Sequence, residues 1–550
     1  MKKTLAALLT GVALCSCSQR PGVTADYRVV PLPGKIEVDT AGTADKFFKL
    51  DKNTVIYYSD AKLANEAQFL AEYLKPLTGL DLRISAKEPS GNYIELDIDD
   101  DMTNAEAYKI DIDSDKIDIE GGSAAGVFYA VQTLRKSIPE AGMHDVNYPV
   151  GEIEDAPRFG YRGAHFDVAR HFFPADSVKT YLDMMALHNM NTFHWHLTED
   201  QGWRIESDKY PLLTEIGSKR PGTTIGHNTE EIDTIPVEGF YTKEQIRDII
   251  DYAAKRHITI IPEIDLPGHM QAALAAYPNL GCTGGPYEVW KRWGVSTEVL
   301  CAGNDSVYAF LDGVLDELTD LFPSEYIHIG GDECPKIEWE KCPKCQAKIK
   351  ELGLKKDKEH TAEQKLQSHV TKHVSDFLAS KGRKIIGWDE ILEGGIAPDA
   401  TVMSWRGEAG GIKASDMGHD VIMTPNTYLY FDYYQSPDRD KQPLAIGGNL
   451  PLDKVYSYEP TPDTMSPEQK AHIKGVQANL WTEYVPTFAH AQYMVLPRWG
   501  ALAEIQWMQP GTRDYKEFYE RLKHLTKIYE AEGYNYCTLA FEDENAGAVK

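Results

Sequence analysis

The residues best suited to chemistry in this sequence are carboxylates and tryptophans that follow short apolar segments. Asp332 and Glu333 are the most prominent, because they come directly after Tyr326–Gly331, an apolar run that ends in two glycines. Carboxylates act as general acids and bases, and the faces of tryptophan rings stack on the C–H surfaces of sugars. These residue types therefore indicate acid–base chemistry on a ligand with a partly apolar ring.

The pattern repeats along the chain, since polar or aromatic residues follow most of eight predicted strands. The strands are Gly163–Val168, Thr192–Leu197, Thr259–Asp265, Tyr326–Gly331, Lys384–Trp388, Thr401–Trp405, Asp420–Thr424 and Gly475–Leu480. The candidate side chains at or after their ends are Arg170, Glu199, His269, Asp332, Glu333, Trp388, Trp405, Tyr430, Asp432, Trp481 and Glu483. Any one of them alone is more often a helix cap, an ion-pair partner or a core residue. Their joint occurrence is what indicates a functional site.

Helical patterns lie between most of these strands, at Pro174–His188, Lys243–Arg256, Ser306–Leu321, Ala362–Ser380 and Ala409–Met417. Eight strand–helix steps in one chain predict an α/β fold, the (β/α)8 TIM barrel. Catalytic groups in such barrels lie at the carboxyl ends of the strands, so the candidates would share one rim. The Pro-, Gly- and Tyr-rich stretch from Asn426 to Lys474 is expected to form a loop region of the active site.

A smaller α/β domain of sheet and helices is predicted before the barrel. Its expected elements are a strand at Thr54–Tyr58, a helix at Lys62–Leu77, a hairpin of Tyr108–Ile112 and Lys116–Glu120, and a helix at Ala124–Lys136. Ser123 is placed to cap the last of these helices. The predicted division is a signal segment at 1–17, an N-terminal domain at 27–155, a catalytic barrel at 156–510, and a C-terminal helix (Tyr515–Glu532) with its tail at 511–550.

The N-terminus has the features of a bacterial export signal. Lys2 and Lys3 precede a short apolar run, and Leu14 to Cys17 resembles a lipobox in which Cys17 would carry the lipid. We therefore expect an exported protein, in the periplasm or at the outer membrane, that touches the membrane only through a lipid on Cys17. The formal charge of −27 makes nucleic acid an improbable partner, because such a surface repels phosphate backbones.

Six cysteines follow Cys17, and an exported protein can form disulfides between them. They are Cys282, Cys301, Cys334, Cys342, Cys345 and Cys537. Cys282 and Cys301 form a candidate disulfide pair. Cys342 and Cys345 form one C-x-x-C motif, but a zinc ribbon needs a second such motif, and none exists. We therefore expect disulfides or free thiols, with no metal and no cofactor.

The order of Asp332 and Glu333 also limits the mechanism. Adjacent side chains on an extended segment point to opposite sides, so the pair is not expected to flank a bond as the acid and nucleophile of a retaining glycosidase. One carboxyl group could protonate a leaving oxygen while the other holds a nucleophile that the substrate supplies. Gly330 and Gly331 would leave room for a sugar to approach the backbone.

Several motifs together resemble glycoside hydrolase family 20, the β-N-acetylhexosaminidases. The motifs are His328–Glu333, Arg162–His171, Phe193–Leu197, Pro262–His269 and Trp481–Glu483, and the resemblance covers nearly the whole chain. It implies an exo-acting, retaining enzyme that removes terminal non-reducing N-acetyl-β-D-hexosamine (GlcNAc or GalNAc) from glycans or chitooligosaccharides. The substrate's own 2-acetamido group would be the nucleophile.

The resemblance also implies a role for each candidate residue. Glu333 would be the general acid and base, and Asp332 would orient the acetamido N–H while Tyr430 binds its carbonyl oxygen. His269 would belong to a relay with Glu199, although the family often has Asp at the position of Glu199. The substrate-binding residues would be Arg170, Trp388, Trp405, Asp432, Trp481 and Glu483.

Two alternatives belong to other classes. A metal-dependent barrel hydrolase would use His194 and His196, which share one face of a strand, but it needs further histidines on later strands. A lipid-anchored sugar-binding protein without catalysis would keep the tryptophans and lose the acid, yet Glu333 is present.

Overall fold

We describe a computed structural model of the chain for residues 22–39 and 46–542. Cys15, Cys17 and the rest of the predicted export signal lie outside these residues. No helix within the described ranges is long and apolar enough to span a bilayer.

The N-terminal part folds around a seven-stranded mixed sheet covered by two helices. The sheet order is β2-β10-β7-β8-β6-β4-β5, with strands Lys35–Val38, Gly151–Asp155, Tyr108–Ile112, Lys116–Gly121, Tyr93–Ile98, Val55–Tyr58 and Arg83–Ser85. The predicted hairpin is confirmed, because β7 and β8 pair in antiparallel register. Helices α1 (Ala64–Thr78) and α2 (Ala124–Lys136) are also close to prediction, and the Ala125 amide donates to Ser123 Oγ at 3.1 Å. A three-stranded sheet of β1 (Gly22–Thr24), β9 (Asp145–Pro149) and β3 (Phe47–Leu50) lies beside it.

The larger part is a closed barrel of eight parallel strands, so the predicted TIM barrel is confirmed. Its strands are β11 (Tyr161–Asp167), β12 (Thr192–His196), β17 (Thr259–Glu263), β18 (Tyr326–His328), β19 (Lys384–Trp388), β20 (Thr401–Ser404), β21 (Val421–Met423) and β22 (Ile473–Leu480). Each corresponds to one predicted strand, with small differences at the ends. The strand predicted to reach Gly331 ends at His328 instead, because Gly330 adopts a φ of 62° and leaves the extended region.

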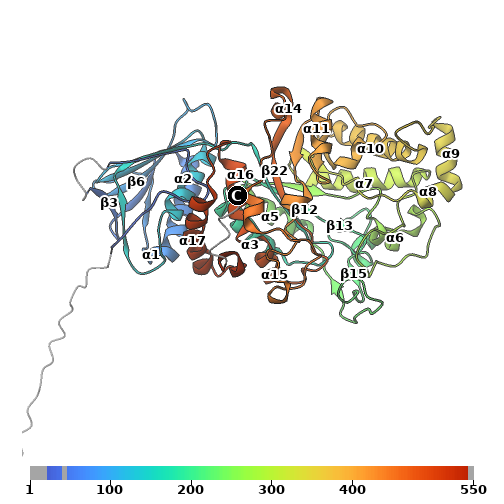
Figure 1. The fold of residues 1–550 in the computed structure, drawn as a ribbon, viewed down its shortest axis with the longest axis horizontal. Coiled ribbons are helices and arrows are strands. Elements are labelled where there is room, and N and C mark those ends of the chain that lie inside the picture. The colour runs from blue at the N-terminus through green and yellow to red at the C-terminus, as the bar shows by residue number, and fades with distance from the viewer. Residues whose placement is uncertain (1–21, 40–45, 543–550) are drawn as a thin grey trace, which may run out of the picture.

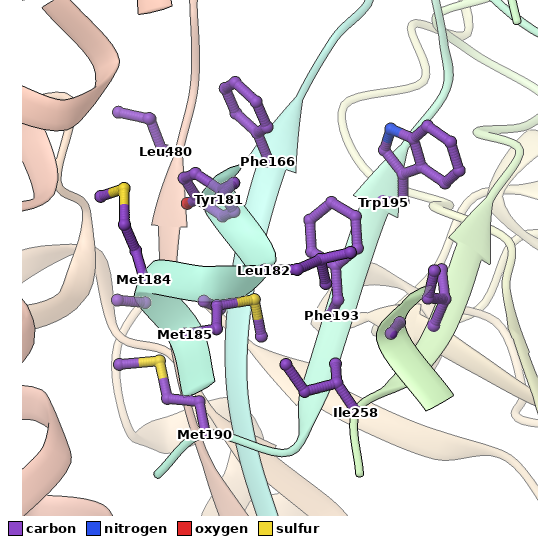
Figure 2. Packing of buried hydrophobic residues seen from close by; sticks show 14 of the residues in the cluster. Phe166, Tyr181, Leu182, Met184, Met185, Met190, Phe193, Trp195, Ile258 and Leu480 are labelled. Atoms are coloured by element: carbon purple, nitrogen blue, oxygen red, sulfur yellow. The ribbon is translucent and has the colours of Figure 1, made fainter. Parts of the chain in front are cut away.

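Alternation along the strands separates the hydrophobic layer from the barrel interior. On β12, Phe193 and Trp195 point toward the outer layer; Phe193 lies beside Leu182 of α3 (Ala175–Leu187) in Figure 2, and Trp195 packs on Tyr241 at a centroid distance of 4.7 Å. Between them, the side chains of His194 and His196 face the interior and are fully buried. The outer positions thus hold the core together, and the inner positions are free to carry chemistry.

Helices α5 (Lys243–Ala254), α7 (Asp305–Leu321), α10 (Ala362–Ser380) and α11 (Ala409–Asp416) surround the barrel with α3, close to the predicted ranges. The C-terminal helix α17 (Tyr515–Glu532) lies between the N-terminal domain and the barrel (Figure 1). It contacts both sides: Glu532 forms an ion pair with Arg135 of α2, and the Tyr529 hydroxyl forms a 2.7 Å hydrogen bond with His188, which follows α3. It therefore joins the two parts of the molecule.

The cysteines correct one prediction. Cys282 and Cys301 do not form a disulfide with each other, and none of the six cysteines that follow Cys17 forms a disulfide. Cys301 Sγ lies 3.7 Å from the Sγ atoms of both Cys342 and Cys345, whereas a disulfide requires about 2.05 Å.

Candidate active site

The candidate side chains converge at the carboxyl ends of the barrel strands. Arg170 follows β11, Glu199 follows β12, and His269 follows β17. Asp332 and Glu333 follow β18, while the aromatic residues come from the later strands and their loops. Ion pairs, hydrogen bonds and ring contacts link most of these candidates into one group at the rim, as the sequence predicts.

The loop that carries Asp332 and Glu333 is a turn and not an extended strand. Gly331 and Glu333 have φ values of 96° and 40°, and the positive φ at Glu333 is a conformation that a non-glycine residue rarely adopts. Consequently both carboxyl groups approach the same atom: Asp332 Oδ2 and Glu333 Oε2 lie 3.7 and 3.8 Å from His269 Nε2. The expectation that the two side chains point to opposite sides is therefore wrong.

The role assigned to the two glycines is also corrected. A Cβ atom on Gly330 would lie 1.8 Å from Asp265 Oδ1, and the Gly331 amide donates to that same oxygen at 3.2 Å. The space beside Gly330 is thus filled by a buried aspartate of the neighbouring segment. The glycine is needed for this close approach and for its positive φ, not to admit a sugar.

A chain of alternating carboxylates and imidazoles runs beneath the two acids. His269 Nδ1 lies 2.9 Å from Glu199 Oε2, and Glu199 Oε1 lies 3.1 Å from His196 Nε2. The other nitrogen of His196 contacts Glu263. Burial alone would lower the pKa of His196, but Glu263 and Glu199 outweigh it and raise the pKa to about 10. His196 is therefore an imidazolium that links two carboxylates.

Arg170 is fixed among three acidic side chains. Its guanidinium lies 3.1 Å from Asp167, 2.9 Å from Glu199 and 3.9 Å from Glu483, and it covers the ring of Trp481 at 5.0 Å from the centroid. Burial raises the pKa of Glu199, yet Arg170 and His269 lower it well below its ordinary value. Both groups are thus charged and rigidly placed.

The aromatic candidates form a connected wall. Trp405 stacks on Tyr430 with ring centroids 6.0 Å apart, and Trp481 lies 6.3 Å from Tyr430 and 5.8 Å from Trp388. Trp388 is only 1% exposed, so it forms the floor, whereas Trp405 is half-buried. Such flat, apolar surfaces suit the methyl group and C–H face of an N-acetyl sugar.

The carboxyl group of Asp332 shares a side-chain hydrogen bond with the carboxyl group of Asp265. His269 Nε2 and Asp432 Oδ1, in contrast, are buried polar atoms of the site without a hydrogen-bond partner among the described residues. Buried polar atoms are almost always paired, so unpaired ones at a barrel rim indicate where a ligand would bind. Asp432 also lies close enough to Glu483 for the charge of Glu483 to raise its pKa, after the larger effect of burial.

The two acids differ from ordinary carboxyl groups in their titration. Burial, followed by the charge of Asp332, raises the pKa of Glu333. Burial also raises the pKa of Asp332, which His269 partly offsets. Glu333 therefore keeps a proton to higher pH than a free glutamate, as a general acid requires.

Several residues at the predicted strand ends support the site, although the sequence assigned them no role. Glu263 accepts from the Trp388 indole at 3.0 Å and contacts His194 at 2.9 Å, and Glu390 accepts from the Trp405 indole at 2.9 Å. Asp265 fills the space beside Gly330. The available signal was alternation, because Glu263 and Asp265 occupy alternate positions at the end of a predicted strand and so point to one side.

The number of histidines alone does not exclude a metal-dependent hydrolase, because further histidines lie near His194. His165 of β11 and His328 of β18 do lie beside His194, with ring centroids at 4.8 and 4.3 Å. These three side chains and His196 are fully buried, whereas a catalytic metal needs an open position for substrate. Glu263, which contacts His194, His196 and His328, instead anchors Trp388.

Comparison with known proteins places the chain among sugar hydrolases. Residues 159–510 match the catalytic domain of glycosyl hydrolase family 20, and residues 26–156 match domain 2 of the same family. A beta-hexosaminidase of Porphyromonas gingivalis is 43% identical over 96% of this chain and 67% of its own length. A beta-hexosaminidase of Vibrio furnissii is 37% identical, and the match covers 72% of this chain and 64% of that protein.

Solved structures agree with this assignment. A family 20 exo β-N-acetylglucosaminidase of Vibrio harveyi in complex with N-acetylglucosamine has a TM-score of 0.80 at 31% identity, covering 94% of this chain and 80% of its own. A β-N-acetylhexosaminidase of Bacteroides fragilis has a TM-score of 0.76 at 32% identity, covering 92% and 96%. The family match extends over both parts of the molecule and includes the residues of the rim. The chain therefore belongs to glycosyl hydrolase family 20.

Proposed function

We propose that the chain is an exo-acting β-N-acetylhexosaminidase that releases terminal non-reducing N-acetyl-β-D-hexosamine from glycans or chitooligosaccharides. The observation that carries this proposal is the pair Asp332 and Glu333, both directed at His269, with Asp332 oriented by its hydrogen bond to Asp265. A carboxylate fixed in this way is the acceptor that an acetamido N–H needs. The family membership makes the same activity the expected one.

In the proposed first step, the acetamido carbonyl oxygen attacks C1 and the bond from C1 to the leaving oxygen breaks. Glu333 gives its proton to that oxygen, and Asp332 stabilises the positive charge that develops on the oxazolinium ring. The Tyr430 hydroxyl donates a hydrogen bond to the acetamido oxygen and keeps its proton. Burial raises the pKa of Tyr430 well above its ordinary value, so this donor stays protonated.

In the second step, the Glu333 carboxylate removes a proton from water, and the water oxygen attacks C1 from the side that the leaving group vacated. The C1 bond to the acetamido oxygen breaks, so the configuration at C1 is retained. Arg170, Glu483 and Asp432 would bind the sugar hydroxyls, and Trp388, Trp405 and Trp481 would enclose the ring and methyl group. A single enclosed ring supports removal of chain-end sugars one at a time.

The activity is tested with two aryl β-glycosides that differ only at C2. The N-acetylglucosaminide should be hydrolysed with retention, and the plain glucoside should not react. A chitooligosaccharide should yield monosaccharide from the first turnover onward. Equal hydrolysis of both glycosides, or oligosaccharides as the first products, would contradict the proposal.

We also propose that the protein is exported and held at the membrane by a lipid on Cys17. Support comes from the sequence, in which a basic start and a short apolar run precede Leu14–Cys17. Cells fed a labelled fatty acid should label the wild-type chain and Cys15→Ser, but not Cys17→Ser. Labelling of Cys17→Ser would refute the assignment.

A further inference from the structure

Four cysteines from distant positions in the sequence meet in one cluster at the side of the barrel. They are Cys282, Cys301, Cys342 and Cys345, whose Sγ atoms all lie within 4.8 Å of one another. The Sγ distances are 3.7 Å for Cys301 to Cys342, 3.7 Å for Cys301 to Cys345, and 3.9 Å for Cys282 to Cys345. The other two cysteines of the described barrel, Cys334 and Cys537, make their contacts elsewhere, with Pro335 and Tyr493.

These distances match the edges of a small tetrahedron. Zinc binds thiolate sulfur at about 2.3 Å, so four sulfurs at the corners of a tetrahedron around zinc lie roughly 3.8 Å apart. A disulfide would instead bring two of the sulfurs to about 2.05 Å. The cluster therefore has the size of a four-thiolate metal site and not that of two disulfides.

The cluster is buried, and backbone N–H groups face it. Cys301, Cys342 and Cys345 are buried, and Cys282 is partly buried. The backbone N–H of Gly303 faces the sulfurs of Cys301 and Cys345. Cys342 is the N-cap of α9 (Pro343–Glu351), so the positive end of that helix lies at the cluster. Gly303 allows this contact, because a Cβ there would lie 2.3 Å from the Cys345 amide nitrogen.

We propose that Cys282, Cys301, Cys342 and Cys345 bind one structural zinc ion through four thiolates. Each thiol releases its proton to solvent when it binds, and no electron is transferred. Four sulfur ligands in tetrahedral arrangement suit zinc and fill all its positions, so the ion has no open site for substrate. The site is therefore structural, and it is independent of the activity proposed above.

The proposed ion connects the segments that follow the two catalytic loops. Cys282 and Cys301 lie at the two ends of the loop 283–300, which follows His269 by way of α6 (Gln271–Ala276), and the Leu300 amide donates to the Pro267 carbonyl at 3.0 Å. Cys342 and Cys345 follow Glu333 by way of α8 (Ile337–Lys341), whose Trp339 indole donates to the Leu300 carbonyl at 2.9 Å. Zinc would thus fasten the supports of His269 and Glu333 to each other, at the end of the molecule far from the N-terminal domain (Figure 1).

The spacing of the four cysteines along the chain does not match a known zinc motif, so the sequence did not predict this site. Cys342 and Cys345 form the one C-x-x-C motif, and the other two ligands are single cysteines in a loop. The structure joins that loop at its base, where Gly281 and Leu300 form a β-bridge next to Cys282 and Cys301. A second pair of ligands therefore exists in space although no second motif exists in the sequence.

The test begins with the full-length wild-type enzyme, purified without chelator and then gel-filtered. Elemental analysis should give about one zinc per chain, because four-thiolate sites bind zinc tightly. A mercurial thiol reagent should release that zinc in proportion to the thiols titrated, as measured with a chromogenic zinc indicator. Native mass spectrometry should show the zinc-bound mass with all four cysteines reduced.

Variants then locate the ion. Cys301→Ser and Cys345→Ser should lose the zinc and lower the thermal midpoint by roughly 5–10 °C, whereas the matched control Cys537→Ser, at another buried cysteine, should keep it. The wild-type measurement stands alone if the variants do not fold. A mass lower by the hydrogens lost in two disulfides, iron in place of zinc, or zinc retained by Cys301→Ser would each overturn the proposal.

Discussion

His196 Nε2 lies 3.1 Å from Glu199 Oε1, and this contact connects the barrel interior to the catalytic rim. On its other side His196 contacts Glu263, and Glu199 continues to His269 at 2.9 Å. His269 in turn faces both Asp332 and Glu333. The orientation of Asp332 and Glu333 therefore depends on His269 and, through it, on the buried charges of Glu199, His196 and Glu263.

The first prediction concerns the stability that His196 provides. Its pKa of about 10 in the folded protein exceeds the unfolded value of roughly 6.5, so its contribution is complete below pH 6.5 and is lost as the pH rises toward 10. His196→Asn should remove the cation that lies between Glu263 and Glu199 and destabilise the protein by about 3–5 kcal/mol near pH 6.5. The thermal-midpoint difference from wild type should shrink between pH 6.5 and 10.

His165→Asn is the matched control, because its ring lies 5.6 Å from that of His196 in the same interior. Burial lowers the pKa of His165 well below its ordinary value, so it is neutral across this pH range. Its midpoint difference should stay constant from pH 6.5 to 10. A constant difference for His196→Asn as well would show that His196 is not charged.

The second prediction concerns Glu199. Glu199→Gln keeps the shape but removes the charge that His269, His196 and Arg170 share. We expect kcat to fall about 10²-fold or more, and the pKa of His269 to fall, since Glu199 is the carboxylate that raises it most. The His269 ring can be followed by NMR as a function of pH. An unchanged His269 titration would contradict the relay.

The barrel could be predicted from sequence because its signals are local. Each strand is a short apolar run, helix patterns follow most of these runs, and the eight strands of the structure are the predicted eight. The candidate side chains also follow from the strand ends, since parallel strands deliver those ends to one rim.

What could not be predicted depends on contacts between distant segments. The turn at Gly330 follows from the approach of Asp265, and the charge of His196 follows from Glu199 and Glu263, which no single motif contains. The four-cysteine cluster likewise exists only after the loop from Cys282 to Cys301 folds against α9. The spacing of residues along the chain gives no information about such contacts between distant segments.

The third prediction tests Glu333 as the general acid. Glu333→Gln is nearly isosteric but cannot donate a catalytic proton, so glycosides with poor leaving groups should slow by about 10²–10⁴-fold. Aryl glycosides with acidic phenols need less protonation and should lose less. Equal losses on both kinds of substrate would exclude Glu333 as the acid.

The same variant gives a pH signature. Wild-type kcat/KM should fall at high pH as Glu333 loses its proton, and the raised pKa moves this fall to higher pH than a free glutamate would give. Gln does not titrate, so the alkaline fall should disappear in Glu333→Gln when an acidic phenol is the leaving group. Persistence of that fall would assign it to another residue.

The last prediction asks which group attacks C1. The turn at Gly331 and Glu333 brings both carboxyl groups toward His269, so backbone direction alone does not prevent Asp332 from acting as a nucleophile. Two features favour the acetamido oxygen. Asp332 is buried and held by Asp265 and His269, as an acceptor for the acetamido N–H would be, and the intramolecular attack avoids the entropy cost of placing a separate group.

Asp332→Asn should therefore slow acetamido substrates by about 10²–10³-fold without lowering the thermal midpoint, because the amide cannot stabilise the oxazolinium charge. A thiazoline analogue of the bicyclic intermediate should inhibit the wild type competitively and bind this variant more weakly. Intact-mass measurement during turnover should detect no glycosylated protein. A glycosyl adduct that disappears in Asp332→Asn would identify Asp332 as the nucleophile. An unchanged affinity of Asp332→Asn for the thiazoline would show that Asp332 does not interact with the acetamido group.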